Sequence, residues 1–509
     1  MKRTMIRLRE TVFIRHLARI NTHSSLHEKT GGTFLKERTS ASTIYALSSG
    51  QGKCGVAVIR VSGSKASKAI EKMTKVKTLQ PRKAHLSQII DPETKEVIDR
   101  GLCLWFPGPN SFTGEDSVEF QVHGGPAVLS GIMEALFKLK FEPASPGEFT
   151  RRAFYNGKLD LTEVEGLADL IHAETEQQRK QALLQASGSL SNLYKYWHTV
   201  LSQSLANIEA YIDFGEEENI ESNVLENCNN ELEKLSKLIA EHLKDGRKGE
   251  ILRNGVRTVI MGEPNVGKSS LLNILVQRNA AIVTPIPGTT RDIVELNANI
   301  SGYPVILADT AGVAKSTEDI IEIEGIKRAK DYAKNADFII ILMDASVFCK
   351  SGLTIDQYID NYIKDLQLDD SVMEDEGFSK KFLMVFNKTD LVDEQVIKSL
   401  QNRGITMISC AQEKGLKKLI DVMTEHFCKI CGNPSRENPT ISQSRYRNHL
   451  KNCLDYLLDY LDMISQEEFD MVIAAEKIRS AMRELGKITG HVSTEDILDI
   501  IFKNFCIGK

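Results

Sequence analysis

Apolar and polar positions divide the chain into stretches with different periods. Between Ser42 and Phe141, short β-rich runs at residues 55–63, 102–106 and 117–125 alternate with turns, and an apolar helical segment follows them. This arrangement predicts an α+β domain.

After Pro146 the apolar residues recur at steps of three and four, which is the period of one helix face. The stripe comprises Leu190, Leu193, Trp197, Leu201, Leu205, Ile208 and Ile212. Such a stripe predicts one buried face of a helical bundle.

A third pattern begins at Arg257, where continuous apolar runs alternate with helical segments. The runs lie at residues 258–262, 305–310, 338–344, 382–388 and 405–410. Strands that are apolar on both faces belong to a mostly parallel sheet with helices on both sides. Helical periodicity returns after Pro439. The simplest architecture is therefore a mostly parallel-sheet domain inserted into a helical domain, whose halves flank it.

A chain of 509 residues is too long for one hydrophobic core, so we expect a multidomain α/β protein. No apolar run is long enough to cross a bilayer, and no membrane insertion is expected. The nine scattered cysteines predict free thiols in a reducing compartment. Cys428 and Cys431 form a C-x-x-C pair, but no second pair with ligand spacing accompanies it, so no metal role is expected there. The acidic stretch 365–377 is expected to be a surface loop.

The first 27 residues are basic, with apolar residues between the charges. They contain Lys2, Arg3, Arg7, Arg9, Arg15 and Arg19 against the single acid Glu10. This pattern predicts a mitochondrial transit peptide within residues 1–40 and hence a matrix protein, with an untargeted basic tail as the alternative. Without those 27 residues the chain holds 58 basic and 68 acidic residues, and this net charge of −10 disfavours tight binding to nucleic acid by the chain alone.

Residues 262–269 match the phosphate-binding pattern G-x-x-x-x-G-K-[ST], between an apolar strand and a helix. The backbone N–H groups of such a P-loop cradle phosphates, Lys268 reaches the β and γ oxygens, and Ser269 ligates Mg²⁺. The nucleotide contacts expected in this loop are Asn265, Val266, Gly267, Lys268, Ser269 and Ser270. The strand before the loop and the helix after it make a chance match remote.

Three further motifs follow later strands. Asp309 begins D-T-A-G, in which a carboxylate can hold the water shell of the metal and the last N–H can contact the γ-phosphate. Residues 387–390 read N-K-T-D, in which Asp390 can accept from the N–H groups of guanine and so reject adenine, and residues 409–411 read S-C-A where such domains carry S-A-x. These motifs add to the expected GTP site Asp309, Thr310, Ala311, Gly312, Asn387, Lys388, Asp390, Ser409, Cys410 and Ala411.

Between the P-loop and D-T-A-G lies the segment P-G-T-T-R-D at residues 287–292. A threonine here can close over the γ-phosphate and ligate Mg²⁺, which is the behaviour of a switch segment. Thr290 is the candidate ligand, with Thr284 and Thr289 beside the nucleotide. The four motifs, in this order, predict a GTP-hydrolysing domain of the Ras-like P-loop type over residues 253–432.

With these motifs in place, the chain resembles one family, the MnmE (TrmE) tRNA-modification GTPases. The matching sequence covers nearly all residues after the leader, including residues 106–126, 145–171, 262–273, 286–292 and 505–509. With its basic leader, the chain resembles a mitochondrial member. The resemblance implies an N-terminal folate-binding and dimerisation domain over 41–157, helical halves over 158–252 and 433–509, and the GTPase domain between them.

The resemblance also implies a function. Members of the family work with an FAD-dependent partner, MnmG, to attach an aminomethyl-type group to carbon 5 of the wobble uridine of certain tRNAs. A tetrahydrofolate derivative, the 5-formyl or 5,10-methylene form, supplies the one-carbon unit. A homodimer is implied, with tRNA bound mainly by the complex of the two proteins.

Family folate contacts fall on Arg60, Glu119, Lys158 and Lys509 of this sequence. The basic side chains can meet the carboxylates of a folate, and a glutamate can accept from the pterin N–H groups. Cys506 is implied as a catalytic cysteine beside that pocket, with a small buried apolar side chain as the alternative.

The position that holds a water-orienting glutamine in Ras-type GTPases is Val313 here, and valine cannot orient water. The resemblance implies instead a catalytic carboxylate on Glu322, with Glu324 or Glu318 left open because the loop is one residue longer than the family pattern. It also implies a K⁺ site, formed by Asn265, Thr284, Ile286 and Thr289.

Two other classes of GTPase share such a nucleotide domain. A ribosome-assembly switch would carry a basic RNA-binding module where this chain has residues 42–171 and the C-I-G-K ending. A membrane-remodelling GTPase would carry a basic amphipathic face or a lipidation signal, and the sequence has neither. We therefore expect a tRNA-modifying GTPase.

Overall fold

The computed structural model describes residues 42–214, 223–279, 295–309, 332–366, 381–401, 403, 405–492, 495–503, 505 and 508. The chain forms two compact units, of which one holds Met1–Lys158 and Ile500–Lys509 and the other holds Leu159–Asp499. The transit-peptide prediction, residues 1–40, lies outside the described residues.

The first unit is built on a six-stranded sheet in the order β3-β4-β5-β2-β1-β6. Its strands are β1 Ile44–Leu47, β2 Cys54–Ser62, β3 His85–Ile90, β4 Val97–Phe106, β5 Ser117–Gly124 and β6 Glu142–Pro143. Neighbouring strands are antiparallel except β1 and β6. The sheet order leaves β3 at one edge.

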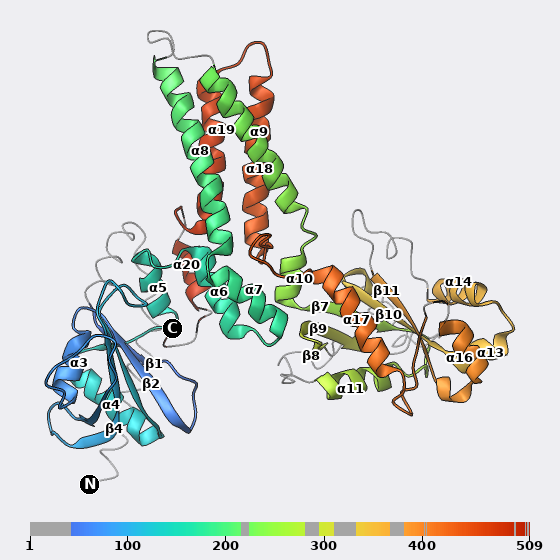
Figure 1. The fold of residues 1–509 in the computed structure, drawn as a ribbon, viewed down its shortest axis with the longest axis horizontal. Coiled ribbons are helices and arrows are strands. Elements are labelled where there is room, and N and C mark those ends of the chain that lie inside the picture. The colour runs from blue at the N-terminus through green and yellow to red at the C-terminus, as the bar shows by residue number, and fades with distance from the viewer. Residues whose placement is uncertain are drawn as a thin grey trace, which may run out of the picture. The chain divides into compact units, whose positions relative to one another are not determined.

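One face of this sheet packs against two helices, α3 (Ala66–Met73) and α4 (Pro126–Lys138), shown in blue and cyan in Figure 1. Alternate strand residues point to that face and form the core, such as Ile59 and Val61 on β2 and Phe120 on β5. The residues between them point to the opposite face. Because of this alternation, polar side chains from neighbouring strands lie together on that opposite face.

The chain end packs into the first unit. The helix α5 (Glu148–Tyr155) contacts the end of α20 (Glu495–Lys503), where the rings of Phe154 and Phe502 lie 6.3 Å apart between centroids. A Cβ added at Gly147 would lie 2.4 Å from the carbonyl oxygen of Phe502, so a glycine is needed at this contact. The sequence assigned residues 433–509 to the second helical half, whereas residues 500–509 belong to the N-terminal unit.

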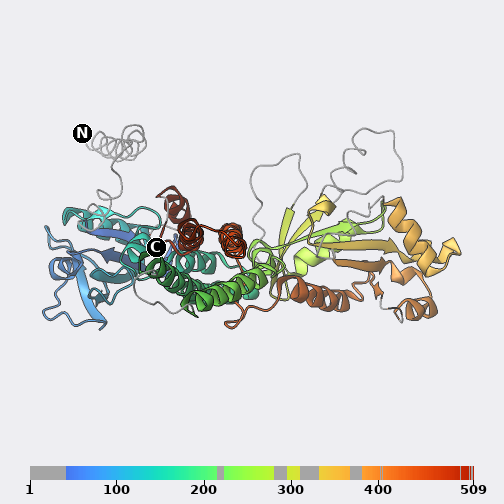
Figure 2. The ribbon, with the colours of Figure 1, turned by 90° about the horizontal axis from the view of Figure 1, so that it is seen from above.

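The second unit contains a helical bundle that both halves of the chain build together. Its helices are α6 Leu161–His172, α7 Glu176–Ala186, α8 Ser189–Phe214, α9 Asn223–Leu243, α18 Ser444–Ile464 and α19 Met471–Thr489. The last four pack side by side, and Figure 2 looks nearly along α18 and α19, drawn in red. Capping boxes at Asp160 and Thr175 fix the starts of α6 and α7.

The predicted apolar stripe on α8 faces the bundle core. Leu190, Trp197, Leu201 and Ile208 are buried there, and the other three members pack partly buried against the same core. The same core contains residues of α9 and residues of α18 and α19 that are more than two hundred positions away along the chain, such as Tyr446. The stripe prediction is therefore confirmed.

The second sheet has six strands in the order β12-β11-β10-β7-β9-β8. They are β7 Val256–Met261, β8 Glu295–Ile300, β9 Tyr303–Asp309, β10 Phe338–Asp344, β11 Lys381–Asn387 and β12 Thr406–Met407. All neighbours are parallel except the edge strand β8, which runs antiparallel to β9. The polar–apolar alternation of β8 suits an edge strand, and the sequence had not indicated it.

Helices cover both faces of this sheet. They are α10 Lys248–Asn254, α11 Lys268–Asn279, α13 Ala345–Ser351, α14 Ile355–Asp365, α16 Glu394–Gln401 and α17 Leu416–Cys431. Along β10, Phe338, Ile340 and Leu342 pack toward α11 and α17, whereas Ile339 and Ile341 pack toward α14 and α16. Burial on both sides explains why the run is apolar throughout, as predicted.

Three smaller expectations concern the surface and the thiols. Every cysteine in the part of the chain that the structure describes is free, as predicted. Within the same residues, no helix is long and apolar enough to span a membrane. Most of the acidic stretch 365–377 lies outside the described residues.

Candidate functional site

The P-loop turn joins β7 to α11 at the carboxyl end of the parallel sheet. Lys268 is buried, and its Nζ donates to the carbonyl oxygens of Gly262 at 2.9 Å and Glu263 at 2.8 Å. Asn265 has a φ of 63° and Gly267 one of 102°, so the turn is left-handed at both positions. Ser269 and Ser270 are exposed in the first turn of α11, where helix N–H groups favour an anion.

Asn387, the last residue of β11, joins the P-loop to the S-C-A loop after β12. Its Nδ2 donates to the carbonyl oxygen of Val266 at 2.8 Å, and its Oδ1 accepts from the Cys410 N–H at 3.0 Å. A Cβ added at Gly267 would lie 2.3 Å from the same Nδ2, so only glycine allows this approach. One buried amide thus connects three of the sequence motifs.

Asp390 and the S-C-A loop also meet. The Ser409 hydroxyl donates to Asp390 Oδ1 at 2.5 Å. This bond holds the Asp390 carboxylate in place, and the residue is exposed. Ala411 is exposed beside them. Burial raises the pKa of the Cys410 thiol to about 11, so this residue is a neutral thiol at physiological pH.

Tyr362 and Asp344, which the sequence analysis did not single out, support these loops. The Tyr362 hydroxyl on α14 accepts from the Glu263 N–H and donates to the Leu342 carbonyl oxygen, both at 2.8 Å. Lys388 Nζ forms a 2.7 Å ion pair with Asp344. Burial alone would raise the pKa of Asp344, but hydrogen bonds from Lys388 and Ser346 outweigh it and hold that pKa below its usual value.

Asp344 could have been found from the sequence, because it ends an apolar strand at the same sheet edge as the motifs. Nothing in the sequence marks Tyr362, whose partner Glu263 is 99 positions away.

Several predicted site residues cannot be placed. Thr284, Ile286, Thr289, Thr290, Thr310, Ala311, Gly312, Glu322, Cys506 and Lys509 lie outside the described residues, as do Glu318 and Glu324. Of Asp309 the structure describes the backbone, which pairs with Ile260 at the end of β9. The switch, potassium and water-orienting assignments therefore stay predictions.

A second candidate site lies on the first sheet. Arg60 on β2 and Glu119 on β5 are directly opposite each other in the register, and Arg60 Nε and Nη2 donate to Glu119 Oε1 at 3.1 and 2.9 Å. The guanidinium lies 5.6 Å from the ring centroid of Phe112 and 5.9 Å from that of Phe149. Within the described residues, Glu119 Oε2 and Arg60 Nη1 make no hydrogen bond, so the pair offers one acceptor atom and one donor group to a ligand.

A buried polar network adjoins this pair. Arg152 on α5, 2% exposed, donates to Glu115 Oε2 at 2.9 Å and to Glu148 Oε1 at 3.2 Å. The Ser62 hydroxyl donates to the same Glu115 oxygen at 3.0 Å. The network positions the loop that carries Phe112, and sequence reasoning did not predict it.

Lys158, the other described member of the predicted folate set, is exposed after the left-handed Gly157. At the chain end, the Ser48 hydroxyl donates to the Gly508 carbonyl oxygen at 2.9 Å. A Cβ added at Gly508 would lie 2.2 Å from the Leu47 carbonyl oxygen. Gly508 of the terminal motif therefore lies at the end of β1, which pairs with the strand that holds Arg60.

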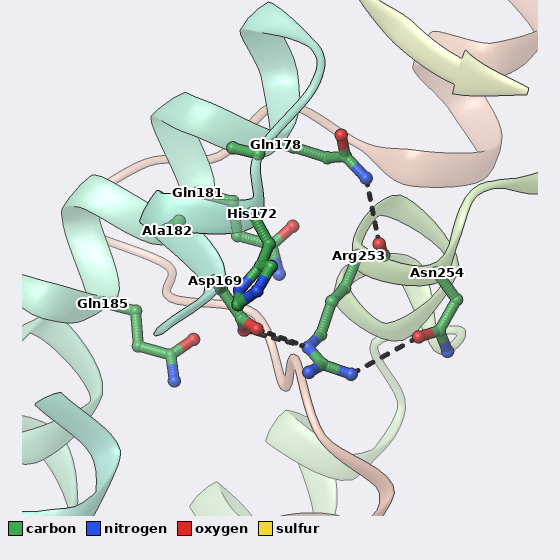
Figure 3. A pocket seen from close by; sticks show the side chains of 9 residues that line it. Asp169, His172, Gln178, Gln181, Ala182, Gln185, Arg253 and Asn254 are labelled. Carbon is green, nitrogen blue, oxygen red and sulfur yellow. Dashed lines mark hydrogen bonds and ion pairs between the residues drawn. The ribbon is translucent and has the colours of Figure 1, made fainter. Parts of the chain in front are cut away.

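A polar pocket of about 300 Å³ lies elsewhere in the second unit, between α6, α7 and α10 (Figure 3). Arg253 Nε donates to both carboxylate oxygens of Asp169 at 2.9 Å, and Gln178 Nε2 donates to the Arg253 carbonyl oxygen at 3.0 Å. The pocket adjoins the start of β7, at the end of the strand opposite the P-loop. It ties the helical part to the nucleotide sheet and is not the nucleotide site.

Comparison with known proteins places these features in a family. Residues 161–506 match the model of the MnmE helical domain, and residues 43–158 match that of the GTP-binding protein TrmE N-terminus. The chain belongs to the MnmE family of tRNA-modification GTPases. Together the two models match most of the chain after residue 42.

Relatives of this MnmE-family chain span almost its whole length. The mitochondrial 5-taurinomethyluridine-tRNA synthase subunit of Danio rerio is 46% identical, over 92% of this chain and 93% of its own. The human protein of the same name is 45% identical, over 92% and 94%. The tRNA modification GTPase MnmE of Rickettsia bellii is 42% identical, over 92% of this chain and all of its own. These comparisons confirm the family and its mitochondrial branch.

Proposed function

We propose that this protein uses GTP hydrolysis to modify carbon 5 of the wobble uridine in mitochondrial tRNAs, together with an MnmG-type FAD-dependent partner. The observation that carries the proposal is the union in one chain of the Asn387-centred nucleotide loops and the Arg60–Glu119 site. The names of the relatives support the same chemistry, and those of the vertebrate relatives favour a taurine-derived group.

The nucleotide loops fit GTP with Mg²⁺. Buried Lys268 and the first turn of α11 offer donors to the β and γ phosphates, and exposed Ser269 offers a hydroxyl to the metal, with Thr290 as its second protein ligand. Asp390, held by Ser409, accepts from the guanine N–H groups. Asn265, whose left-handed backbone brings it to the surface of the loop, contributes to the K⁺ site with Thr284, Ile286 and Thr289.

The first unit fits a tetrahydrofolate derivative. Glu119 Oε2 accepts from pterin N–H groups. Because Arg60 is paired with Glu119, we assign its Nη1 to a pterin acceptor and not to the carboxylates that the resemblance had suggested, while Phe112 and Phe149 lie near the guanidinium. Lys158 and Lys509 meet the glutamyl carboxylates, and Cys506 lies beside the pocket. When bound, the folate supplies the one-carbon unit that becomes the methylene group of the modification.

We also propose the division of the chain that the family implies. A leader within 1–40 precedes a folate-binding and dimerisation domain over 41–157, and the GTPase domain over 253–432 lies between helical halves that end and begin near 252 and 433. The shared bundle core of α8 and α18 supports an insertion between two helical halves. The protein acts as a homodimer and binds tRNA mainly through its complex with the flavoprotein.

Mass spectrometry of mitochondrial tRNA nucleosides tests the function. Cells that lack this protein should contain wobble uridines without the carbon-5 group, and the unsubstituted protein should restore it. Asp390→Asn should not restore it, whereas Lys237→Glu, on an exposed face of α9, should. Normal nucleosides together with a ribosome-assembly defect in the deletion cells would instead support an assembly GTPase.

A further inference from the structure

A strongly basic segment lies in the first unit and takes no part in either candidate site. Residues 65–88 carry one acid, Glu71, against seven basic residues. These are Lys65, Lys68, Lys72, Lys75, Lys77, Arg82 and Lys83. The segment thus has a net charge of +6 inside a chain whose net charge is −5. Such segregation of charge calls for a physical cause.

All seven basic side chains are exposed. On α3 this follows from amphipathicity, because Ala66, Ala69, Ile70 and Met73 face the core and the lysines take the other side. None of the seven forms an ion pair with any residue that the structure describes. Their charge is therefore available to a partner.

The segment borders an open groove of about 660 Å³ along the edge strand β3. Its polar lining includes Lys75, Lys77, Thr78, His85, Ser87 and Arg100. Lys75 is held in place there, since its Nζ donates to Gln88 Oε1 at 3.1 Å and its N–H donates to the Ser87 hydroxyl at 3.3 Å. No Phe, Tyr or Trp is among the described residues that line this groove, so only the His85 ring and the Arg100 guanidinium could stack on a base there.

We propose that this basic edge, defined as residues 65–88 with Arg100, binds the sugar–phosphate backbone of the tRNA that the proposed function modifies. Lysine and arginine meet phosphates, and the hydroxyl and amide groups of Thr78, Ser87 and Gln88 suit ribose hydroxyls. Contacts of this kind position an RNA without reading its bases. The basic edge therefore orients the tRNA, and the choice of uridine is made elsewhere.

Neither protection of the sheet edge nor a membrane surface accounts for these charges as well as RNA does. Charged side chains on an edge strand prevent pairing with other sheets, but the lysines of α3 are not on the strand. A membrane surface would be met by an apolar face that enters the lipid, whereas Leu86 is the one large exposed apolar side chain described in the groove lining. RNA is the partner that the charges and neutral polar groups favour together.

The experiment measures the affinity of the full-length protein for a labelled mitochondrial tRNA transcript across a series of KCl concentrations. The test variant combines Lys75→Glu, Lys77→Glu and Lys83→Glu, none of which touches a candidate site. The matched control combines Lys234→Glu, Lys237→Glu and Lys244→Glu, which changes the net charge equally on exposed positions of α9 and just after it.

The test variant should bind tRNA at least about tenfold more weakly at low salt, and the slope of log affinity against log salt should fall by about two to three. The control should bind like the unsubstituted protein, and all three proteins should hydrolyse GTP equally, which shows that they are folded. Equal weakening by test and control, or no weakening in the test variant, would overturn the proposal. So would failure of the unsubstituted protein to bind at low salt.

Vesicles of phosphatidylcholine with anionic phospholipid provide a second arm. If the test variant loses vesicle binding while its tRNA affinity is unchanged, the basic edge binds membranes and the proposal is wrong. The proposed function is judged separately by the nucleosides of the deletion cells. If the modification depends on the protein but the test variant binds and modifies tRNA normally, the basic edge alone has failed.

Discussion

The two six-stranded sheets place their candidate sites in different ways. The parallel sheet is buried on both faces, so its site lies at the carboxyl ends of β7, β10 and β11, in loops that are continuous stretches of sequence. The largely antiparallel sheet has one face free of α3 and α4, so its site lies on that face. There Arg60 and Glu119 meet across two strands although they are 59 positions apart.

This difference decides what can be recognised in each sheet. Loops at the end of a parallel sheet form short continuous motifs whose chemistry can be recognised from the sequence, as in residues 262–269 and 387–390. A site on a sheet face is spread over strands, and only register brings its members together. The predictions below test how far the two sites differ in mechanism, beginning with the largest expected effect.

The strongest test of the parallel-sheet site is Asp390→Asn. Loss of an acceptor for two guanine N–H groups should weaken GTP binding on the order of a thousandfold. An amide can instead donate to the C2 oxygen of xanthine, so the variant should bind and hydrolyse XTP. Nucleotide titrations with both bases measure this, and the gain of XTP binding serves as the control for folding. Weak binding of both nucleotides would mean that the loop has collapsed, and unchanged GTP affinity would remove Asp390 from base recognition.

Hydrolysis should depend on the residues that the sequence predicts for the switch segments. Since Val313 cannot orient water, Glu322→Ala should lower kcat about a hundredfold and leave GTP affinity nearly intact. Replacing K⁺ by Na⁺ should slow turnover in a similar way, and turnover per protein should rise with protein concentration as nucleotide domains pair. Glu324→Ala and Glu318→Ala are the matched variants. If Glu322→Ala were fully active and Glu324→Ala or Glu318→Ala were not, the water-orienting role would belong to that other glutamate. Equal rates in K⁺ and Na⁺ would show that hydrolysis does not depend on K⁺.

The sheet-face site should respond to Arg60→Ala with a loss of about tenfold to fiftyfold in affinity for 5-formyltetrahydrofolate, which is the range for a charge-assisted hydrogen bond. Titration calorimetry measures it, and Arg100→Ala, on an exposed position of neighbouring β4, is the control. GTP turnover should not change in either variant. Equal folate affinity in all three proteins would mean that the Arg60–Glu119 pair is only structural.

How much of this could be predicted from sequence follows the same division. The parallel strands, the bundle stripe and the choice of Lys268 and Asn387 as candidate site residues follow from continuous apolar runs and compact motifs. Arg60 and Glu119 were reached only through family resemblance, because nothing local marks them as partners. Tyr362 and Arg152 were missed altogether, since each acts through contacts with residues distant in sequence. The edge strands β3 and β8 were missed because neither forms a continuous apolar run: β8 alternates in polarity, and β3 is polar over most of its first four residues.

The smallest expected effect is a change in local stability at the turn between β3 and β4, which belongs to the first unit. Asp91 accepts from Lys138 Nζ at 2.7 Å and from the N–H groups of Thr94 at 3.0 Å and Glu93 at 2.8 Å. The Lys138 ammonium, and then the Thr94 N–H, lower the pKa of Asp91 to about 2.

A carboxyl group whose pKa is lowered on folding stabilises the folded state above its unfolded pKa, and this stabilisation is lost as pH falls through the folded value. Asp91→Asn should therefore destabilise the unit by about 1 kcal/mol at neutral pH, and the difference from the unsubstituted protein should shrink between about pH 4 and pH 2. Hydrogen exchange of the β3 and β4 amides, followed by mass spectrometry, measures the local stability. Glu93→Gln, in the same turn but exposed, is the control. If Asp91→Asn changed hydrogen exchange in the parallel sheet as strongly as in β3 and β4, the stabilities of the two sheets would be coupled, and the prediction of a local effect would be wrong.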